Sequence, residues 1–238
     1  MGKTETLLFG SKRRLKGVDF RVFCDVTPVE RKFIVKYLGV LLDDNINGSA
    51  HVSNMMKVCA GRLAFLYRQS SLLNQNCRRT LCSALIQPYI EYCCSSWHCC
   101  LPISLKERLN ILQRKMVRFV YNMDSRGHVD NKNLRVMNWL NIPDRVHFFQ
   151  MMHLFRIRNK LAPRYLLPNF TAVSASHSHN TRGSEYNFSI SRELSLSQSS
   201  FAFSAIKYWN GLPNSIKCIE SFQVFRRKLK QFLFEQYT

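Results

Sequence analysis

The stretch that decides the fold is Phe33-Ile34-Val35-Lys36-Tyr37-Leu38-Gly39-Val40-Leu41-Leu42. It is rich in the β-branched, aliphatic and aromatic residues that strands prefer, so we expect a β-strand over residues 32–42. Gly39 interrupts this strand, and such a glycine marks a bulge or a close approach of another backbone. The stretch runs into Asp43-Asp44-Asn45-Ile46-Asn47-Gly48-Ser49, whose composition is typical of a turn before a helix.

Shorter strand signals precede this stretch. Residues 6–9 are an apolar run that Gly10 stops, residues 12–17 form a basic turn, and residues 20–24 alternate apolar and polar side chains. An isolated sheet of this size would be only marginally stable. The predicted fold class is α+β and mostly α: a small antiparallel sheet followed by a bundle of basic amphipathic helices.

Helical periodicity begins after residue 48. The first helix carries an apolar stripe made of Val52, Met55, Met56, Cys59, Leu63, Leu66 and Tyr67. A second helix is predicted from Asn76 or Cys77 to about Cys94. Pro88 should kink this helix or end it near Gln87, because proline cannot continue the helical hydrogen-bond pattern.

Three further helices are predicted. One spans residues 104–123, where Ser104 and Glu107 have the spacing of a capping box. Residues 144–160 carry apolar side chains on most sides, so we expect the most buried helix there. The last helix starts near Ser221. Residues 171–200 are rich in serine and poor in large aliphatic residues, which predicts a loop or an exposed arm.

These patterns divide the 238 residues into three regions. Residues 1–48 hold the strands, residues 49–125 hold the first helices, and residues 126–238 form a C-terminal helical region with the serine-rich arm. A hydrophobic fraction of 46% supports a real core and argues against wholesale disorder.

The charge balance points to a polyanionic partner. The chain has 35 Lys and Arg against 15 Asp and Glu, a net charge of +20, and nucleic acid is the commonest polyanion. No run of about 18 apolar residues is present to span a membrane. With no secretory signal at the start, the nine cysteines are interpreted as reduced thiols in an intracellular protein of the nucleus or cytoplasm.

Several segments together resemble the reverse transcriptases of non-LTR, LINE-type or jockey-like retrotransposons. They occur in the family's order: residues 3–10 with 35–40, then 59–68, 79–93, 109–118, 179–183 and 209–216. The resemblance covers essentially the whole chain. It implies the end of the polymerase palm, the thumb and the region downstream of the thumb, and therefore a surface that holds a template–primer.

The resemblance also implies a longer parent protein with an endonuclease and a complete polymerase. Polymerases of this family hold two Mg²⁺ ions on palm aspartates around the incoming phosphates. The hairpin that carries two of these aspartates should lie upstream of Lys3. We therefore expect no catalysis from this chain on its own, no cofactor, and Mg²⁺ only in the intact parent.

The predicted nucleic-acid contacts are basic residues and one strand segment. The resemblance assigns primer contact to Lys36, Tyr37 and Gly39. The phosphate-contact candidates are Lys57, Arg62, Arg68, Arg78, Arg79, Arg114 and Arg118. Arg182, beside Gly183 in the serine-rich arm, is a further candidate. For any single residue, the alternative is a solvated basic face.

Other reactive patterns favour structural roles. Asp43-Asp44 lacks the aromatic residue that precedes a catalytic aspartate pair, and the Asn and Gly that follow favour a turn. The cluster of Cys93, Cys94, Cys99 and Cys100 lacks a second pair at zinc-site spacing, so buried thiols are favoured, and metal binding stays open. His177 and His179 are interpreted as exposed.

The predicted function is binding of RNA, RNA–DNA or DNA duplex through backbone charge and shape, without a small-molecule substrate or a membrane. Two alternatives stay open. One is a domesticated helical adaptor whose partner is an acidic protein surface. The other is a fragment of an active RNA-directed DNA polymerase. The preference for RNA or DNA and the oligomeric state are not determined by the sequence.

Overall fold

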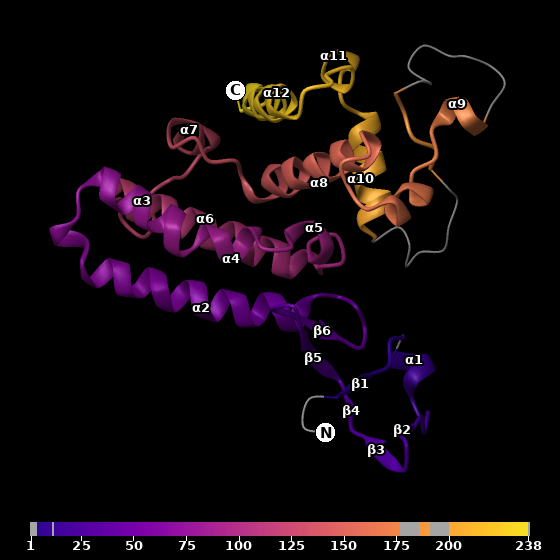
Figure 1. The fold of residues 1–238 in the computed structure, drawn as a ribbon. Helices are drawn as coiled ribbons and strands as arrows, with labels where there is room; N and C mark the ends of the chain where they lie inside the picture. Colours follow the sequence, from indigo (N-terminus) through magenta and orange to yellow (C-terminus); the bar gives the residue numbers. More distant parts are fainter. Residues whose placement is uncertain (1–3, 11, 177–185, 191–199, 238) are drawn as a thin grey trace.

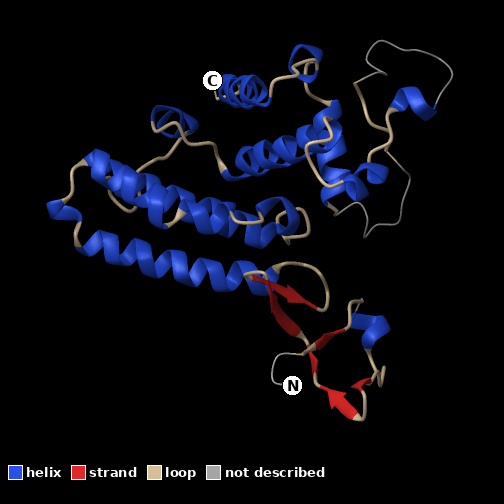
Figure 2. Ribbon diagram, in the orientation of Figure 1, coloured by secondary structure: helices blue, strands red, loops and turns tan. Residues whose placement is uncertain are grey.

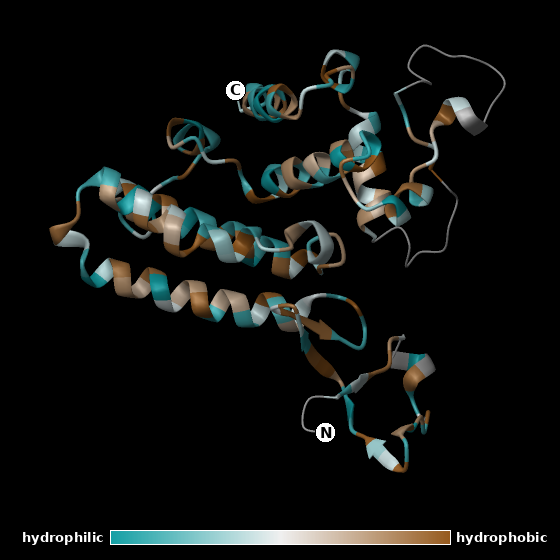
Figure 3. Cartoon of the chain, viewed as in Figure 1, coloured by the Kyte–Doolittle hydropathy of each residue, from teal (hydrophilic) through white to brown (hydrophobic). Residues whose placement is uncertain are grey.

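The computed structural model describes residues 4–10, 12–176, 186–190 and 200–237. Short strands lie at the N-terminal end and helices form the rest (Figures 1 and 2). The prediction of a mostly helical α+β chain is confirmed. Hydrophobic and hydrophilic residues alternate along the helices, as expected for helices with one buried side (Figure 3).

The strands of the described residues form three separate two-stranded sheets, not one antiparallel sheet. They pair as β1 (Thr6–Leu7) with β4 (Arg31–Lys32), β2 (Val22–Cys24) with β3 (Thr27–Val29), and β5 (Ile34–Tyr37) with β6 (Val40–Asp43). The β1–β4 pair is parallel, so the antiparallel prediction is wrong for it. The predicted basic turn contains a short helix, α1 (Lys12–Leu15).

The prediction of one strand over residues 32–42 is wrong, because the segment folds back into the β5–β6 hairpin. Leu38 and Gly39 form the turn with φ of 45° and 85°. Two consecutive left-handed residues are characteristic of a two-residue hairpin turn, and the glycine that suggested a bulge serves this turn. A Cβ on Gly39 would lie 3.3 Å from the ring of Tyr92, so a second constraint also keeps this position small.

A turn that begins at Asp43 leads into α2 (Ser49–Arg68), which runs beside α3, α4 and α6 (Figure 1). The Asp43 carboxylate accepts a hydrogen bond of 3.0 Å from the backbone of Asn47. The Asn47 side chain accepts one of 2.8 Å from the backbone of Ser49. The turn predicted for this segment is confirmed. The buried residues of α2 are His51, Val52, Met55, Cys59, Leu63 and Leu66. The expected stripe is therefore confirmed except at Met56, which is half-buried, and at Tyr67, which is 42% exposed.

The second predicted helix is broken at two places. It consists of α3 (Gln75–Leu85), α4 (Gln87–Glu91) and α5 (Cys94–Trp97). Pro88 lies in the first turn of α4, so the predicted effect of this proline is confirmed. The second break lies at Cys93, whose φ of 52° is left-handed, and nothing in the local sequence signals it.

The next helix is α6 (Ile103–Tyr121), and its predicted capping box is wrong. Pro102 is the N-cap residue, and no side chain caps the helix start. Ser104 therefore lies inside the first turn. Glu107 is paired instead with Arg114 two turns further along the helix, at 2.6 Å. Proline fixes the backbone angle before the helix, but it has no side-chain acceptor for the amides of the first turn.

The C-terminal region packs around α8 (Ile142–Arg158), which begins after the Asn141 cap. Around it lie α7 (Asn131–Val136), α10 (Phe201–Asn210), α11 (Asn214–Lys217) and α12 (Phe222–Glu235), with a 3-10 helix at Arg164–Asn169. Met151, Leu154 and Phe155 of α8 are fully buried. Phe155 stacks on Phe225 of α12 at 4.4 Å between ring centroids.

Part of the predicted serine-rich arm is anchored to this core. Beyond α9 (Val173–Ser176), the Asn210 side chain donates to the carbonyl of Phe188 at 2.8 Å and accepts from its amide at 3.0 Å. The Phe188 ring is buried against Phe170 and Trp209. The exposed-arm prediction is therefore wrong for Phe188. The predicted sites at His177, His179 and Arg182 lie outside the described residues.

Candidate nucleic-acid interface

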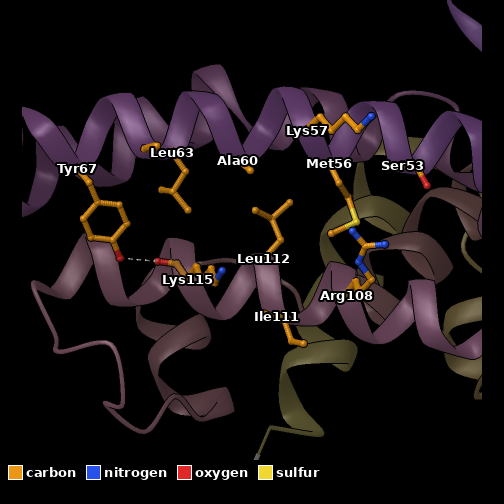
Figure 4. A pocket seen from close by; sticks show the side chains of 11 residues that line it. Ser53, Met56, Lys57, Ala60, Leu63, Tyr67, Arg108, Ile111, Leu112 and Lys115 are labelled. Carbon is orange, nitrogen blue, oxygen red and sulfur yellow. Dashed lines mark hydrogen bonds between the residues drawn. The ribbon is translucent and has the colours of Figure 1, made fainter.

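A groove of about 790 Å³ runs between α2 and α6 (Figure 4). The two helices pack side by side, and their facing turns leave this space open along one edge. The lining residues are Ser53, Met56, Lys57, Ala60, Leu63, Ala64 and Tyr67 of α2 and Arg108, Ile111, Leu112 and Lys115 of α6.

The floor of the groove is apolar because aliphatic side chains of α2 and α6 line it. Leu63 and Leu112 are both only 4% exposed and close the bottom. Ala60 and Ala64 leave the α2 side of the groove open, since a methyl group fills little of the space that a longer side chain would occupy. Tyr67 closes one end: its hydroxyl donates a 3.2 Å hydrogen bond to the carbonyl of Lys115. Burial of this ring raises the pKa of Tyr67.

The rim of the groove is cationic. Lys57 comes from α2, and Arg108 and Lys115 come from α6; all three are exposed. No Asp or Glu is among the lining residues. Three positive charges above an apolar floor define a surface that attracts an anion while presenting hydrophobic atoms to its uncharged parts.

Arg108 and Lys115 were missed by sequence reasoning. The signal was present, because residues 108, 111, 112 and 115 have the spacing that places side chains on one face of a helix. The predicted contacts Arg114 and Arg118 lie on a different face of α6. Arg114 is partly exposed and ion-paired with Glu107, which is also exposed.

Three of the predicted phosphate contacts hold the protein together. Arg62 donates to the carbonyl of Leu85 at 2.8 Å and to the Tyr89 hydroxyl at 2.7 Å, with its guanidinium 4.3 Å from the Tyr89 ring centroid. Arg118 donates to the carbonyl of Gly127 at 2.8 Å. These contacts join α2 to α3 and α4, and α6 to the loop that follows it.

Arg78 is the third and is 8% exposed. It donates to the carbonyl of Ser70 at 2.7 Å, to the Asn122 side chain at 2.8 Å and to the carbonyl of Phe119 at 3.3 Å. Its partners are all neutral acceptors at the ends of α2 and α6. Arg78 is therefore committed to holding these two helix ends together.

The remaining predicted contacts are exposed but do not gather at one place. Arg68 lies at the end of α2, 5.8 Å from the Phe65 ring centroid. Arg79 lies on α3 and lines a different groove. Lys36, Tyr37 and Gly39 lie at the hairpin tip, where Tyr37 is 63% exposed.

A hydrogen bond links the hairpin tip to the helical region. The Tyr92 hydroxyl donates a 2.6 Å hydrogen bond to the carbonyl of Leu38. The tip also exposes Leu38 at 74%, beside the exposed Tyr37, so its apolar surface faces solvent.

Neither acidic nor cysteine clusters form a metal site in the described part of the chain. No group of three or more His, Cys, Asp or Glu side chains is placed there to hold an ion. Asp43 is buried and occupied with the turn. Burial raises the pKa of the Cys94 thiol to about 12 and, together with Lys106 and His147, lowers the pKa of His98 to about 4. The Cys99 and Cys100 sulfurs lie 3.8 Å apart and are not joined by a disulfide.

Sequence comparison relates half of this strongly basic helical chain, at a distance, to the reverse transcriptases of non-LTR retrotransposons. The relative is the probable RNA-directed DNA polymerase from transposon X-element of Drosophila melanogaster, 27% identical over 121 residues. The aligned part is 50% of this chain and 13% of that polymerase. No protein-family profile matches the chain, and no solved structure matches it.

The described helices include none long and apolar enough to cross a membrane.

Proposed function

We propose that this chain binds template–primer nucleic acid, with the groove between α2 and α6 as the principal contact surface. The observation that carries the proposal is the rim of Lys57, Arg108 and Lys115 in a groove that no acidic residue lines. The net charge of +20 and the distant similarity to a retrotransposon polymerase support the same partner.

The groove favours recognition of the backbone over recognition of sequence. Lysine and arginine on a rim neutralise phosphates and release their counterions, which supplies affinity for any sequence. The floor of Met56, Leu63 and Leu112 offers atoms that pack against sugars and carries no groups that read base edges. A duplex of RNA, RNA–DNA or DNA meets these requirements.

We assign the predicted contacts unequal roles. Arg68 and Arg114 lie outside the lining of the groove and are proposed as secondary phosphate contacts, and the hairpin residues Lys36, Tyr37 and Gly39 remain the proposed primer contacts. Arg62, Arg78 and Arg118 act indirectly, by positioning the helices that form the groove. A substitution of these three should disturb folding before it disturbs the affinity for phosphate.

We propose further that the chain contributes binding and no polymerisation chemistry. Asp43, the last residue of β6, accepts from the Asn47 amide, and Asp44 accepts from the Asn45 side chain, so both carboxylates take part in the turn. The described residues hold no cluster of three or more His, Cys, Asp or Glu side chains that could hold the Mg²⁺ ions of a polymerase. A primer-extension assay with Mg²⁺ and all four nucleotides tests this part. Extension by the purified chain would overturn it.

The binding proposal is tested with the variant Lys57→Gln/Arg108→Gln/Lys115→Gln. For a DNA duplex, each lost phosphate contact makes the slope of log affinity against log salt shallower by about 0.9, so three should reduce it by about 2.7. The matched control is Lys132→Gln/Lys160→Gln/Lys207→Gln, which removes the same charge at exposed positions outside this groove.

Fluorescence anisotropy with a labelled duplex over a range of salt concentrations gives both slopes. Equal slopes for the two variants would show that the groove residues contribute no more to binding than any other exposed lysines of the chain. A slope near zero for the unsubstituted chain would refute nucleic-acid binding, and would favour an acidic protein surface as the partner instead.

A further inference from the structure

A second basic surface lies where three grooves meet at Lys230 of α12. Grooves of about 630, 450 and 420 Å³ share this lysine, and none of their lining residues lines the groove between α2 and α6. The helices concerned are α3, α4, α7, α8 and α12 (Figure 1). The basic residues along the three grooves are Arg79, Arg135, Arg145, Arg156, Arg226, Arg227 and Lys230.

Acidic residues do not balance this charge. Glu91 and Glu235 are the carboxylates among the lining residues. Glu91 is ion-paired with Arg145, so one cation is compensated. Glu235 accepts a 3.1 Å hydrogen bond from Gln231. The remaining cations line the grooves with at most one carboxylate among them, which leaves a strongly positive surface.

The surroundings of Lys230 also carry more positive than negative charge. Partial burial lowers the pKa of Lys230, and repulsion from Arg145 and Arg226 lowers it further, against a weaker opposing effect of Glu91. Its ammonium lies 5.6 Å from the Phe234 ring centroid. A bound anion would relieve this repulsion, since it would supply the charge that the protein side chains lack.

Aromatic side chains line the largest of the three grooves. Phe148, Phe149 and Phe222 form its apolar wall, and Arg156 lies 4.6 Å over the Phe222 ring centroid. Tyr92 lies in the same lining with half of its surface exposed. A positive groove with accessible rings is the combination that holds a single strand, because phosphates meet the cations and unpaired bases stack on the rings.

We propose that the surface centred on Lys230 binds single-stranded nucleic acid, with the phosphodiester backbone following α12 and a base stacking on Tyr92. This inference rests on the proposed function in one respect, namely that nucleic acid is the partner of the chain. A paired duplex has its bases turned inward, so the aromatic wall selects an unpaired strand. The surface would thus hold a strand that continues beyond the duplex on α2 and α6.

Three variants of the full chain test the assignment, with a labelled single-stranded oligothymidine and a labelled duplex as probes. Arg226→Gln/Lys230→Gln should make the salt slope for the single strand shallower by about 1.4, since each phosphate contact contributes about 0.7. Its affinity for the duplex should stay within about twofold. Tyr92→Leu should weaken single-strand binding, whereas Tyr92→Phe, which keeps the ring and loses the hydroxyl, should retain it.

The outcomes separate the two proposals. If Arg226→Gln/Lys230→Gln keeps the single-strand slope while the substituted α2–α6 groove loses duplex binding, the second surface is refuted and the proposed function stands. If the α12 variant loses single-strand binding while the groove variant keeps duplex binding, the assignment of the α2–α6 groove fails and the second surface stands.

Two further results would overturn the second surface. One is equal weakening by Tyr92→Phe and Tyr92→Leu, because the contact would then depend on the hydroxyl and not on stacking. The other is displacement of the oligothymidine by poly-glutamate at equal charge concentration, because a general polyanion site does not need bases. Thermal unfolding should be unchanged for Arg226→Gln/Lys230→Gln. Both Tyr92 variants lose the hydrogen bond to Leu38 and should lose similar stability, so the difference in binding between them reports the ring alone.

Discussion

Replacing Arg78 by alanine is expected to destabilise the chain strongly, although Arg78 is one of two adjacent arginines on the same helix. Its side chain makes two short hydrogen bonds, at 2.7 Å to Ser70 and 2.8 Å to Asn122, and a longer one of 3.3 Å to Phe119. The guanidinium also lies 5.6 Å from the Phe119 ring centroid.

The magnitude follows from these contacts. A hydrogen bond to a charged group contributes about 1.5 to 3 kcal/mol, so the two short bonds together represent roughly 3 to 6 kcal/mol. Alanine avoids the desolvation of a buried charge, which has no carboxylate partner here and whose Nε lacks a hydrogen-bond partner. Allowing for this gain, we expect the free energy of unfolding to fall by about 3 kcal/mol.

Arg79→Ala is the matched control, because Arg79 is exposed on the same turn of α3. Its free energy of unfolding should change by no more than about 0.5 kcal/mol, as is usual for exposed positions. Urea unfolding followed by circular dichroism measures both variants. A loss below about 1 kcal/mol for Arg78→Ala, or equal losses for the two variants, would refute a structural role for Arg78.

Three further predictions concern the hairpin, the anchored arm and pH. Gly39→Ala should lower the free energy of unfolding by about 1 to 2 kcal/mol, measured by urea titration, because φ is +85° and Tyr92 lies close. Asn210→Ala should remove both hydrogen bonds to Phe188 and speed proteolytic cleavage near Phe188, whereas an unchanged cleavage rate there would contradict this anchor. The pKa of His98 is lowered from 6.5 to about 4 in the folded chain, so the unfolded chain binds the proton more readily. The free energy of unfolding should therefore fall by up to about 3 kcal/mol between pH 6.5 and pH 4. His98→Gln should flatten this part of a curve of stability against pH.

Periodicity was sufficient to predict the long helices, because burial along a single helix repeats with the helix itself. Val52, Cys59 and Leu63 of α2 are buried as the spacing indicated. The break at Pro88 followed from the chemistry of one residue. The β5–β6 turn was harder, because Leu38 has no preference for the left-handed conformation that it adopts.

The candidate site was predicted only in part, since the role of an arginine depends on what the fold places beside it. Arg62 and Arg78 are on helices that carry apolar stripes, and nothing in their local sequence distinguishes them from exposed arginines. Their partners lie more than 20 residues away for Arg62 and more than 40 away for two of the contacts of Arg78. By contrast, the spacing of Arg108 and Lys115 on α6 was sufficient to place them together.

The Tyr92 side chain has a thermodynamic consequence of its own. One end of it holds the carbonyl of Leu38 at the hairpin tip, and the ring lines the groove beside α8 and α12. If a ligand in the groove moves this ring, it changes the affinity of the hairpin for a second ligand. The second ligand then changes the affinity of the groove for the first by the same factor. The two regions therefore share one coupling energy, measurable as the difference in affinity at one region with the other occupied and empty.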